Sequence, residues 1–194
     1  MAVANQPPAH PASSRAEPLR LHIGGEEVRA GWKIVNIQAK PGVDHVGSAT
    51  DLSAFAAASV TEIYASHIYE HLDYKDELPN ALHEAFRVLR PGGIIRIGVP
   101  DLDALCRLML TPGLDVHQRY HVQRMIYGGH VDDFDYHYVG LTFDILSVFL
   151  TDVGFTSIRR LPSFDLFKDA TTTEYLGVPV SLNVMAMKPQ AKSE

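Results

Sequence analysis

A short segment rich in histidine and aspartate carries the side chains best suited to acid–base chemistry. Between Gly128 and Gly140 the sequence reads GGHVDDFDYHYVG. Histidine changes its charge near neutral pH, and a neighbouring carboxylate can fix the orientation of its ring. We therefore predict His130 and His137 as candidate catalytic bases, with Asp135 as the residue that orients one of them.

The histidines of the chain could also bind a metal ion, because imidazole and carboxylate groups are common ligands of divalent cations. A loop with many carboxylates is more often simply solvated, however. His67 and His71, in the sequence SHIYEH, would lie on the same face of a helix, where a structural role is more typical. We therefore predict no metal site.

These residues must be positioned by the segments around them, which read as alternating strands and helices. Short alternating or β-branched runs predict strands, and apolar residues at helical spacing, ended by glycine or proline, predict helices. The predicted strands are 19–24, 33–38, 60–66, 94–99, 156–161 and 180–187, and the predicted helices are 78–89, 102–110 and 142–153. This order predicts an α/β fold with a doubly wound sheet.

In a doubly wound sheet the ligand crevice lies beyond the carboxyl ends of the strands, where the strand order reverses. The residues that follow the predicted strands should therefore line one crevice. They are Gly24, Gly25, Asn36, Ser48 to Asp51, Ser66, His67, Pro100 and Asp101.

The length of 194 residues allows one domain but not a second full one. We predict a disordered N-terminal tail over 1–18, one domain over 19–189 and a C-terminal tail over 190–194. Residues 111–140 are polar and aromatic, so we predict a lid or an insertion there. Its tyrosines could equally form an interface, and we predict a possible homodimer through this segment.

The amino-acid composition limits the kinds of molecule that we expect this protein to bind. A net charge of -6 and arginines scattered along the sequence disfavour binding to a phosphate backbone, so nucleic acid is a poor partner. No run reaches the roughly 18 apolar residues of a membrane span. The single cysteine, Cys106, cannot form an internal disulfide. We therefore predict a cytoplasmic protein that does not bind membranes.

Four stretches resemble class I S-adenosylmethionine-dependent methyltransferases, particularly bacterial members encoded near glycan genes. LHIGGEEVRAGWKIVNI is similar to the family's first two strands, and EIYASHIYEHL to its fourth strand. RVLRPGGIIRIGVPDL, the most specific stretch, and GLTFDILSVFLTDVGFTSI are similar to later parts of the domain. The resemblance implies a mostly parallel seven-stranded sheet with an antiparallel terminal strand, and an insertion after the fifth strand.

The resemblance also implies S-adenosylmethionine as cofactor and S-adenosylhomocysteine as product. Gly24 and Gly25 would form the turn that lets backbone amides approach the cofactor. Asn36 stands where the family has an acid for the ribose, and Ser48 where it has one for the adenine, with Asp51 three residues later. The predicted cofactor-binding residues are Gly24, Gly25, Asn36, Ser48, Ala49, Asp51, Ser66 and His67.

Because Asn36 and Ser48 stand where the family has acids, two functions are compatible with the resemblance. The first is methyl transfer to the oxygen or nitrogen of an unidentified small molecule or glycan. The second is a catalytically silent binding or scaffolding module whose cofactor site has lost its acids. A nicotinamide dehydrogenase is disfavoured, because no GxGxxG motif opens the first helix.

Overall fold

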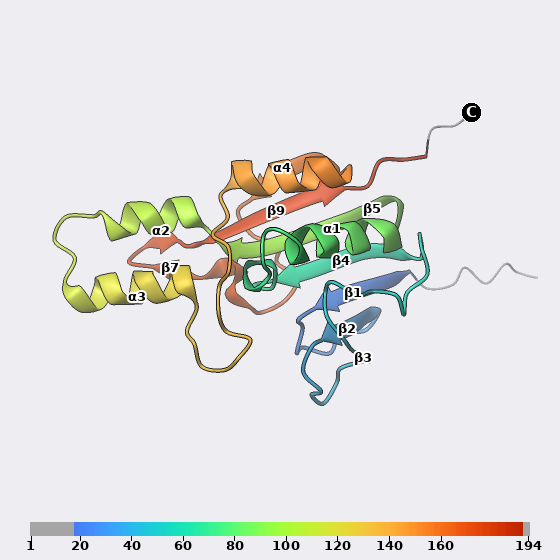
Figure 1. Cartoon of the computed structure of the whole chain (residues 1–194), viewed down its shortest axis with the longest axis horizontal. Coiled ribbons are helices and arrows are strands. Elements are labelled where there is room, and N and C mark those ends of the chain that lie inside the picture. The colour runs from blue at the N-terminus through green and yellow to red at the C-terminus, as the bar shows by residue number, and fades with distance from the viewer. Residues whose placement is uncertain (1–17, 192–194) are drawn as a thin grey trace, which may run out of the picture.

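The computed structural model describes residues 18–191, and its centre is a seven-stranded sheet (Figure 1). The strands are β1 (Leu19–Ile23), β2 (Trp32–Asn36), β3 (His45–Val46), β4 (Val60–Ser66), β5 (Leu89–Pro100), β6 (Thr156–Leu161) and β9 (Ser181–Met187). They lie in the order β3-β2-β1-β4-β5-β9-β6. All neighbours are parallel except β9, which runs antiparallel to both β5 and β6. The predicted mostly parallel sheet with an antiparallel terminal strand is confirmed.

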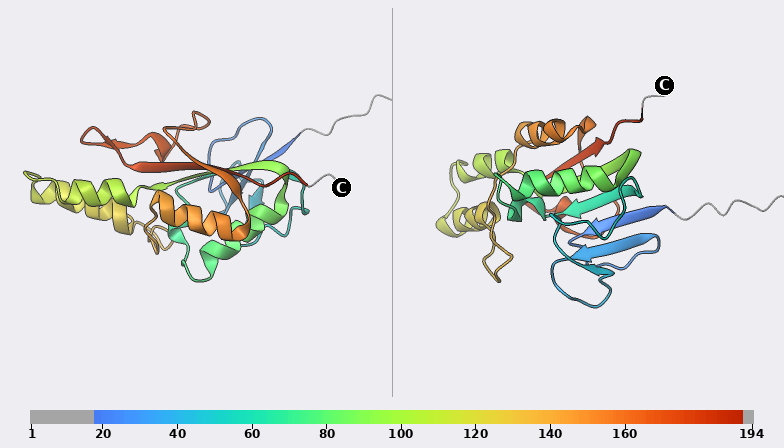
Figure 2. Two further views of the ribbon diagram at one scale, coloured as in Figure 1. Left: turned by 90° about the horizontal axis from the view of Figure 1, so that it is seen from above. Right: turned by 45° about the vertical axis from the view of Figure 1, so that its right-hand side comes forward.

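Two helices, α1 (Glu77–Val88) and α4 (Phe143–Val153), cover one face of the sheet (Figure 2). The main core lies between them and the sheet, and includes Leu82, Ile63, Ile97 and Leu146, all fully buried. As predicted, Thr142 caps α4, because its side chain accepts a hydrogen bond from the backbone N–H of Ile145.

The opposite face has a different cover at β1, β2 and β4. Residues 24–31 and 37–44 join the first three strands without a helix. The connection between β6 and β9 crosses this face instead (Figure 2). It includes the 3-10 turn η2 (Ala170–Thr172), β7 (Glu174–Tyr175) and β8 (Val178–Pro179). Phe167 from this connection packs on His22, Trp32 and Tyr64.

Helices α2 (Leu102–Met109) and α3 (Val116–Tyr127) pair with each other beyond the carboxyl end of β5 (Figure 1). Leu105, Leu108 and Val122 form a second, small core with Val180. A loop then returns from α3 to Leu141, which pairs with Asp101. The predicted lid segment 111–140 thus holds a helix as well as a loop.

Two local expectations are wrong. His67 and His71 do not share an α-helical face, because the chain there forms only the 3-10 turn η1 (Tyr69–His71), and His67 has a positive φ of 54°. Asp101 does not line a crevice: it is buried at the start of α2, where its side chain accepts the N–H groups of Asp103 and Ala104. The predicted tails fall outside the described residues, except for residues 18, 190 and 191.

Candidate functional site

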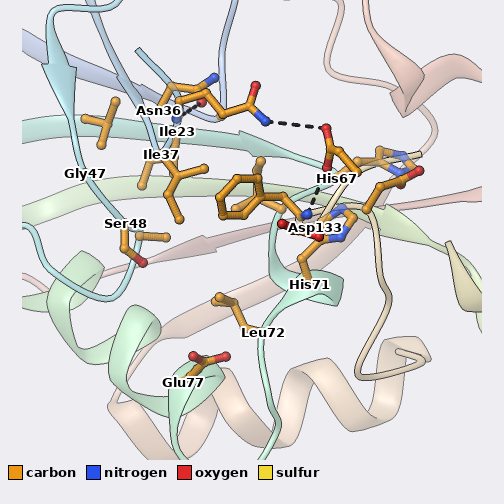
Figure 3. A pocket seen from close by; sticks show the side chains of 18 of the residues that line it. Ile23, Asn36, Ile37, Gly47, Ser48, His67, His71, Leu72, Glu77 and Asp133 are labelled. Carbon is orange, nitrogen blue, oxygen red and sulfur yellow. Dashed lines mark hydrogen bonds between the residues drawn. The ribbon is translucent and has the colours of Figure 1, made fainter. Parts of the chain in front are cut away.

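A cavity of about 780 Å3 opens at the carboxyl ends of β1, β2 and β4. This is the edge of the sheet at which a ligand crevice is expected. Figure 3 shows Asn36 and Ser48 on one side of the cavity, and His67 and His71 on the other. Of the predicted cofactor-binding residues, Gly24, Asn36, Ser48, Ala49 and His67 line it.

The glycine turn after β1 is shaped by close packing. Gly24 has a φ of +73°, and a Cβ there would lie 1.9 Å from Cδ1 of Ile68. Its N–H donates to the carbonyl oxygen of Val35, at 2.7 Å. Gly25 does not line the cavity, and a Cβ there would lie 2.4 Å from the ring of His22. Both positions therefore require glycine, and Gly24 is the one that reaches the cavity.

The amide of Asn36 holds this turn in place. Its Nδ2 donates to the carbonyl oxygen of Gly25 at 3.2 Å, and its Oδ1 accepts the N–H of Gln38 at 2.9 Å. The oxygen keeps a second lone pair for a ligand. Asn36 therefore links the turn after β1 to the end of β2 by hydrogen bonds, and it also lines the cavity.

The loop after β3 supplies Ser48 and Ala49. The Ser48 hydroxyl contacts that of Thr50 at 2.8 Å, so it is partly engaged within its own turn. Asp51 does not line the cavity: its carboxylate accepts hydrogen bonds from the side chain and from the backbone N–H of Ser53, which lower its pKa. Arg87 of α1 fixes the loop by donating to the carbonyl oxygens of Leu52 and Phe55.

The cavity has a strongly acidic lining. The carboxylates come from Glu26, Asp73, Glu77, Asp132, Asp133 and Asp135, whereas Lys40 is the only lysine or arginine in the lining. Lys40 is neutralised by Glu26, at 2.5 Å. Such a lining favours a cationic ligand group over an anionic one.

His67 lies at the end of β4 and connects the cavity with the protein interior. Its Nδ1 is 3.1 Å from Oε1 of the fully buried Glu70, and its Nε2 is 3.1 Å from Oγ of Ser181. Burial opposes the charged imidazole, but the hydrogen bond and the charge of Glu70 together raise the pKa of His67. The same ion pair overcomes burial to lower the pKa of Glu70. Ser66, predicted beside His67, does not line the cavity.

The predicted catalytic residues are only partly brought together. Asp135 lines both the main cavity and a second one of about 280 Å3, which His67, His137 and Pro100 also line. His130 lines neither cavity, since its ring stacks on Tyr136 and its Nε2 lies 2.9 Å from the carbonyl oxygen of Tyr127.

The carboxylate of Asp135 accepts the N–H of Val131 and has no hydrogen bond to either histidine ring in the described part of the chain. The proposed catalytic roles stay predictions, with His137 and Asp135 better placed than His130. Burial lowers the pKa of His137, which favours the neutral ring that a base requires.

Several cavity residues were missed by the reasoning from sequence. Gln38 lies two residues beyond β2, and its side-chain amide reaches Oδ2 of Asp132 at 3.5 Å. Asp132 and Asp133 belong to a loop more than ninety residues away in sequence. The acidic run in GGHVDDFD was the available signal, but only the fold reveals that it faces the strand ends.

Comparison with known proteins agrees with this geometry. Residues 28–97 match the family model described as a methyltransferase domain. This match runs from β2 to most of β5, and so includes Asn36, Ser48 and His67 but not the glycine turn. No curated protein matches the sequence.

Solved structures share the fold at low identity. A 1,6-didemethyltoxoflavin-N1-methyltransferase from Burkholderia thailandensis is 16% identical with a TM-score of 0.56, over 90% of this chain and 72% of that one. A SAM-dependent methyltransferase from Archaeoglobus fulgidus is 16% identical with a TM-score of 0.55, over 88% and 86%. The CurJ carbon methyltransferase is 15% identical with a TM-score of 0.53, over 89% of this chain but only 49% of its own.

The strand order, the cavity at the strand ends and these likenesses show the fold of class I S-adenosylmethionine-dependent methyltransferases, as the sequence predicted. The chain spans about half the length of the CurJ enzyme and nearly all of the archaeal one. No helix among residues 18–191 is long and apolar enough to cross a membrane.

Proposed function

We propose that this protein binds S-adenosylmethionine and transfers its methyl group to an oxygen or nitrogen atom of a small-molecule acceptor. The observation that carries the proposal is the 780 Å3 cavity at the strand ends, which lies within the usual size range of ligand sites. Its acidic lining suits the positively charged sulfonium and ammonium groups of this cofactor.

The residues of the cavity fit the cofactor. The turn at Gly24 has no Cβ, so backbone groups can approach a ligand closely. Asn36 has one free acceptor position for a ribose hydroxyl, and Ser48 with Ala49 forms the wall for the adenine side. The bound cofactor would supply an electrophilic methyl group.

The chain's own contribution to the reaction is positioning and proton removal. Transfer to a hydroxyl or amine requires the acceptor atom to be held in line with the methyl group, and one base to take its proton. His137 and Asp135 line the second cavity, which shares His67 with the first. We propose that the acceptor binds at this shared boundary, with His137 as the base.

Isothermal titration with S-adenosylmethionine and S-adenosylhomocysteine tests the proposal. We expect micromolar dissociation constants for the parent protein and loss of binding in Gly24→Asp, because a side chain at this position clashes with Ile68. Gly113→Asp is the matched control, because Gly113 also has a positive φ but has no atom within 4 Å of its missing Cβ.

A second cavity variant keeps the test informative if Gly24→Asp does not fold. Ser48→Tyr places a large ring in the cavity from a partly exposed loop, so it should weaken binding without disturbing the sheet. The proposal fails if the parent shows no binding at millimolar cofactor, or if both cavity variants bind as tightly as the parent.

A silent binding module is the second candidate, and one observation favours it. The polar groups of Asn36 and Ser48 are both already engaged in local hydrogen bonds, where the family resemblance implies free acids. If the double variant Asn36→Asp with Ser48→Asp gains cofactor binding that the parent lacks, this candidate replaces the first. Tight binding by the parent rejects it.

The proposal also covers the domain organisation, the acceptor, the location and the oligomeric state. We propose that residues 19–189 act as one domain, in which residues 111–140 form a lid or an insertion. The bond from Gln38 to Asp132 supports this role. A glycan acceptor and a cytoplasmic location rest on the family resemblance and on composition. A homodimer through residues 111–140 would cover exposed side chains of α3 such as Val116 and Tyr120.

A further inference from the structure

Glu70, His71 and His137 form a compact cluster next to the main cavity. Their potential ligand atoms all lie within 4.8 Å of one another, and no other group of three His, Cys, Asp or Glu residues within 18–191 is as close. Glu70 and His71 belong to η1, and His137 belongs to the loop after α3. Two backbone N–H groups, of Tyr138 and Val139, donate to the carbonyl oxygen of Glu70 and hold the loop against the turn.

Both histidine rings are oriented by a backbone carbonyl. Nδ1 of His71 lies 3.1 Å from the carbonyl oxygen of Tyr136, and Nδ1 of His137 lies 3.2 Å from that of Ile126. A carbonyl oxygen only accepts, so Nδ1 carries the proton and Nε2 keeps its lone pair in a neutral ring. Metal-binding histidines are fixed in this way, by a hydrogen bond from the nitrogen that does not bind the ion.

The carboxylate of Glu70 is buried without a full set of partners. The residue is 1% exposed, and its carboxylate forms an ion pair with His67 through Oε1 alone. Nδ1 of His67 is near Oε1, at 3.1 Å, but Oε2 has no partner atom among the described residues. An ionised carboxylate is costly to bury, and His67 compensates for this charge at only one of the two oxygens.

From this geometry we infer that Glu70, His71 and His137 bind a divalent transition-metal ion of the zinc type. Two imidazoles and one carboxylate form the protein ligand set of open zinc sites and also suit ferrous iron. At bond lengths of roughly 2.1 Å, two ligand atoms of a tetrahedral ion are about 3.4 Å apart. Atoms that lie within 4.8 Å of one another therefore have to close by up to about 1.4 Å, through rotation of the three side chains.

The position of this site gives the ion a role. His71 lines the main cavity and His137 lines the second, so an ion between them would lie where the two cavities meet. Three protein ligands leave one position open to an outside atom. In the metal-bound protein His137 is a ligand and no longer the base. If the proposed methyl transfer holds, the open position would bind an oxygen or nitrogen of the acceptor and lower its pKa, so that the ion takes over the activation assigned to His137 above. The metal site itself does not depend on methyl transfer.

Metal content tests the site without an activity assay. Tag-free protein is stripped with a chelator, incubated with Zn2+, exchanged into metal-free buffer and measured by elemental analysis, with Co2+ absorption as a report on coordination. We expect one ion per chain. His71→Ala and His137→Ala should each raise the dissociation constant at least about 100-fold, since even loss of an outer partner costs 10 to 100-fold. The isosteric Glu70→Gln should do the same.

His83→Ala is the control, because His83 is exposed on α1 and its Nδ1 lies near a carbonyl oxygen of its own helix. It should bind one ion like the parent. The inference is overturned if the parent binds no ion, if the double variant His71→Ala with His137→Ala retains stoichiometric zinc, or if only Mg2+ or Ca2+ binds. Cofactor titration of Glu70→Gln and His137→Ala separates this result from failure of the proposed function, since neither residue lines the main cavity.

Discussion

His22 offers a pH-dependent test of how the sheet is covered on the face away from α1 and α4. The side chain is 5% exposed and lies among Trp32, Tyr64 and Phe167, with the Phe167 ring centroid 4.0 Å away. Its Nδ1 has no hydrogen-bond partner among the described residues. Burial lowers the pKa of His22 from 6.5 to about 4, although Asp169 and Glu27 raise it slightly.

The sign of the effect follows from proton binding. In the folded protein the ring stays neutral down to about pH 4, whereas in the unfolded chain it takes up a proton below 6.5. The unfolded state therefore binds more protons between these values, and the free energy of unfolding falls as the pH falls. A shift of about 2.5 units, at 1.36 kcal/mol each, corresponds to about 3 kcal/mol of stability that is complete above pH 6.5 and lost towards pH 4.

Urea unfolding of the parent and of His22→Leu between pH 7.5 and 4.5 measures how much His22 contributes to the pH dependence of the free energy of unfolding. Trp32, the single tryptophan, lies beside His22 and provides a local fluorescence signal. We expect the parent to lose up to about 3 kcal/mol more than the variant over this range, because all other titrating groups are common to both. His83→Leu, at an exposed histidine, should follow the parent. Parallel curves for the parent and His22→Leu would refute the assignment of a buried neutral imidazole.

Three further substitutions test hydrogen bonds that fix a loop of the site and the first turns of two helices. Arg87→Ala removes the donors that hold the loop carrying Ser48, so we expect a loss of about 1–3 kcal/mol in urea unfolding and a several-fold weaker cofactor affinity by titration. Thr142→Ala should lower the free energy of unfolding by about 1 kcal/mol through loss of the α4 cap, while Thr142→Ser retains it. Asp101→Ala leaves two helix N–H groups and Arg160 without their carboxylate, so we expect a loss of about 3 kcal/mol in the same assay, and a smaller loss for Asp101→Asn.

The regular elements were predictable wherever a buried face imposed a period on the sequence. Strands β4 and β6 have the predicted bounds, and helix α1 is shifted by one residue at each end. Helix α3 was missed because only Val122 of its twelve residues is buried, so it has no apolar stripe. Its capping box, Asp115 with Gln118, was the sequence signal for this helix. Strands of two residues, such as β3, are too short to show any period.

The candidate site was predictable in outline but not in its hydrogen bonds. Position after a strand identified Gly24, Asn36, Ser48 and His67 as neighbours, because parallel strands end at one edge of the sheet. It could not reveal that Asn36 braces Gly25, or that His130 turns away to stack on Tyr136. Such outcomes depend on side-chain rotation within a few ångströms, which no spacing in the sequence encodes.

The short connections of the first three strands explain why the far face needs an aromatic cover. Parallel strands are usually joined by a dozen or more residues that include a helix, but only residues 24–31 join β1 to β2. The face they leave bare is covered by Phe167, from a connection more than 130 residues later. Because the bond from Asn36 to Gly25 and the contact of Gly25 with His22 join this cover to the glycine turn, the shape of the cavity depends on the aromatic packing beneath it. A charge on His22 at low pH should therefore disturb the turn at Gly24 as well as the stability of the sheet.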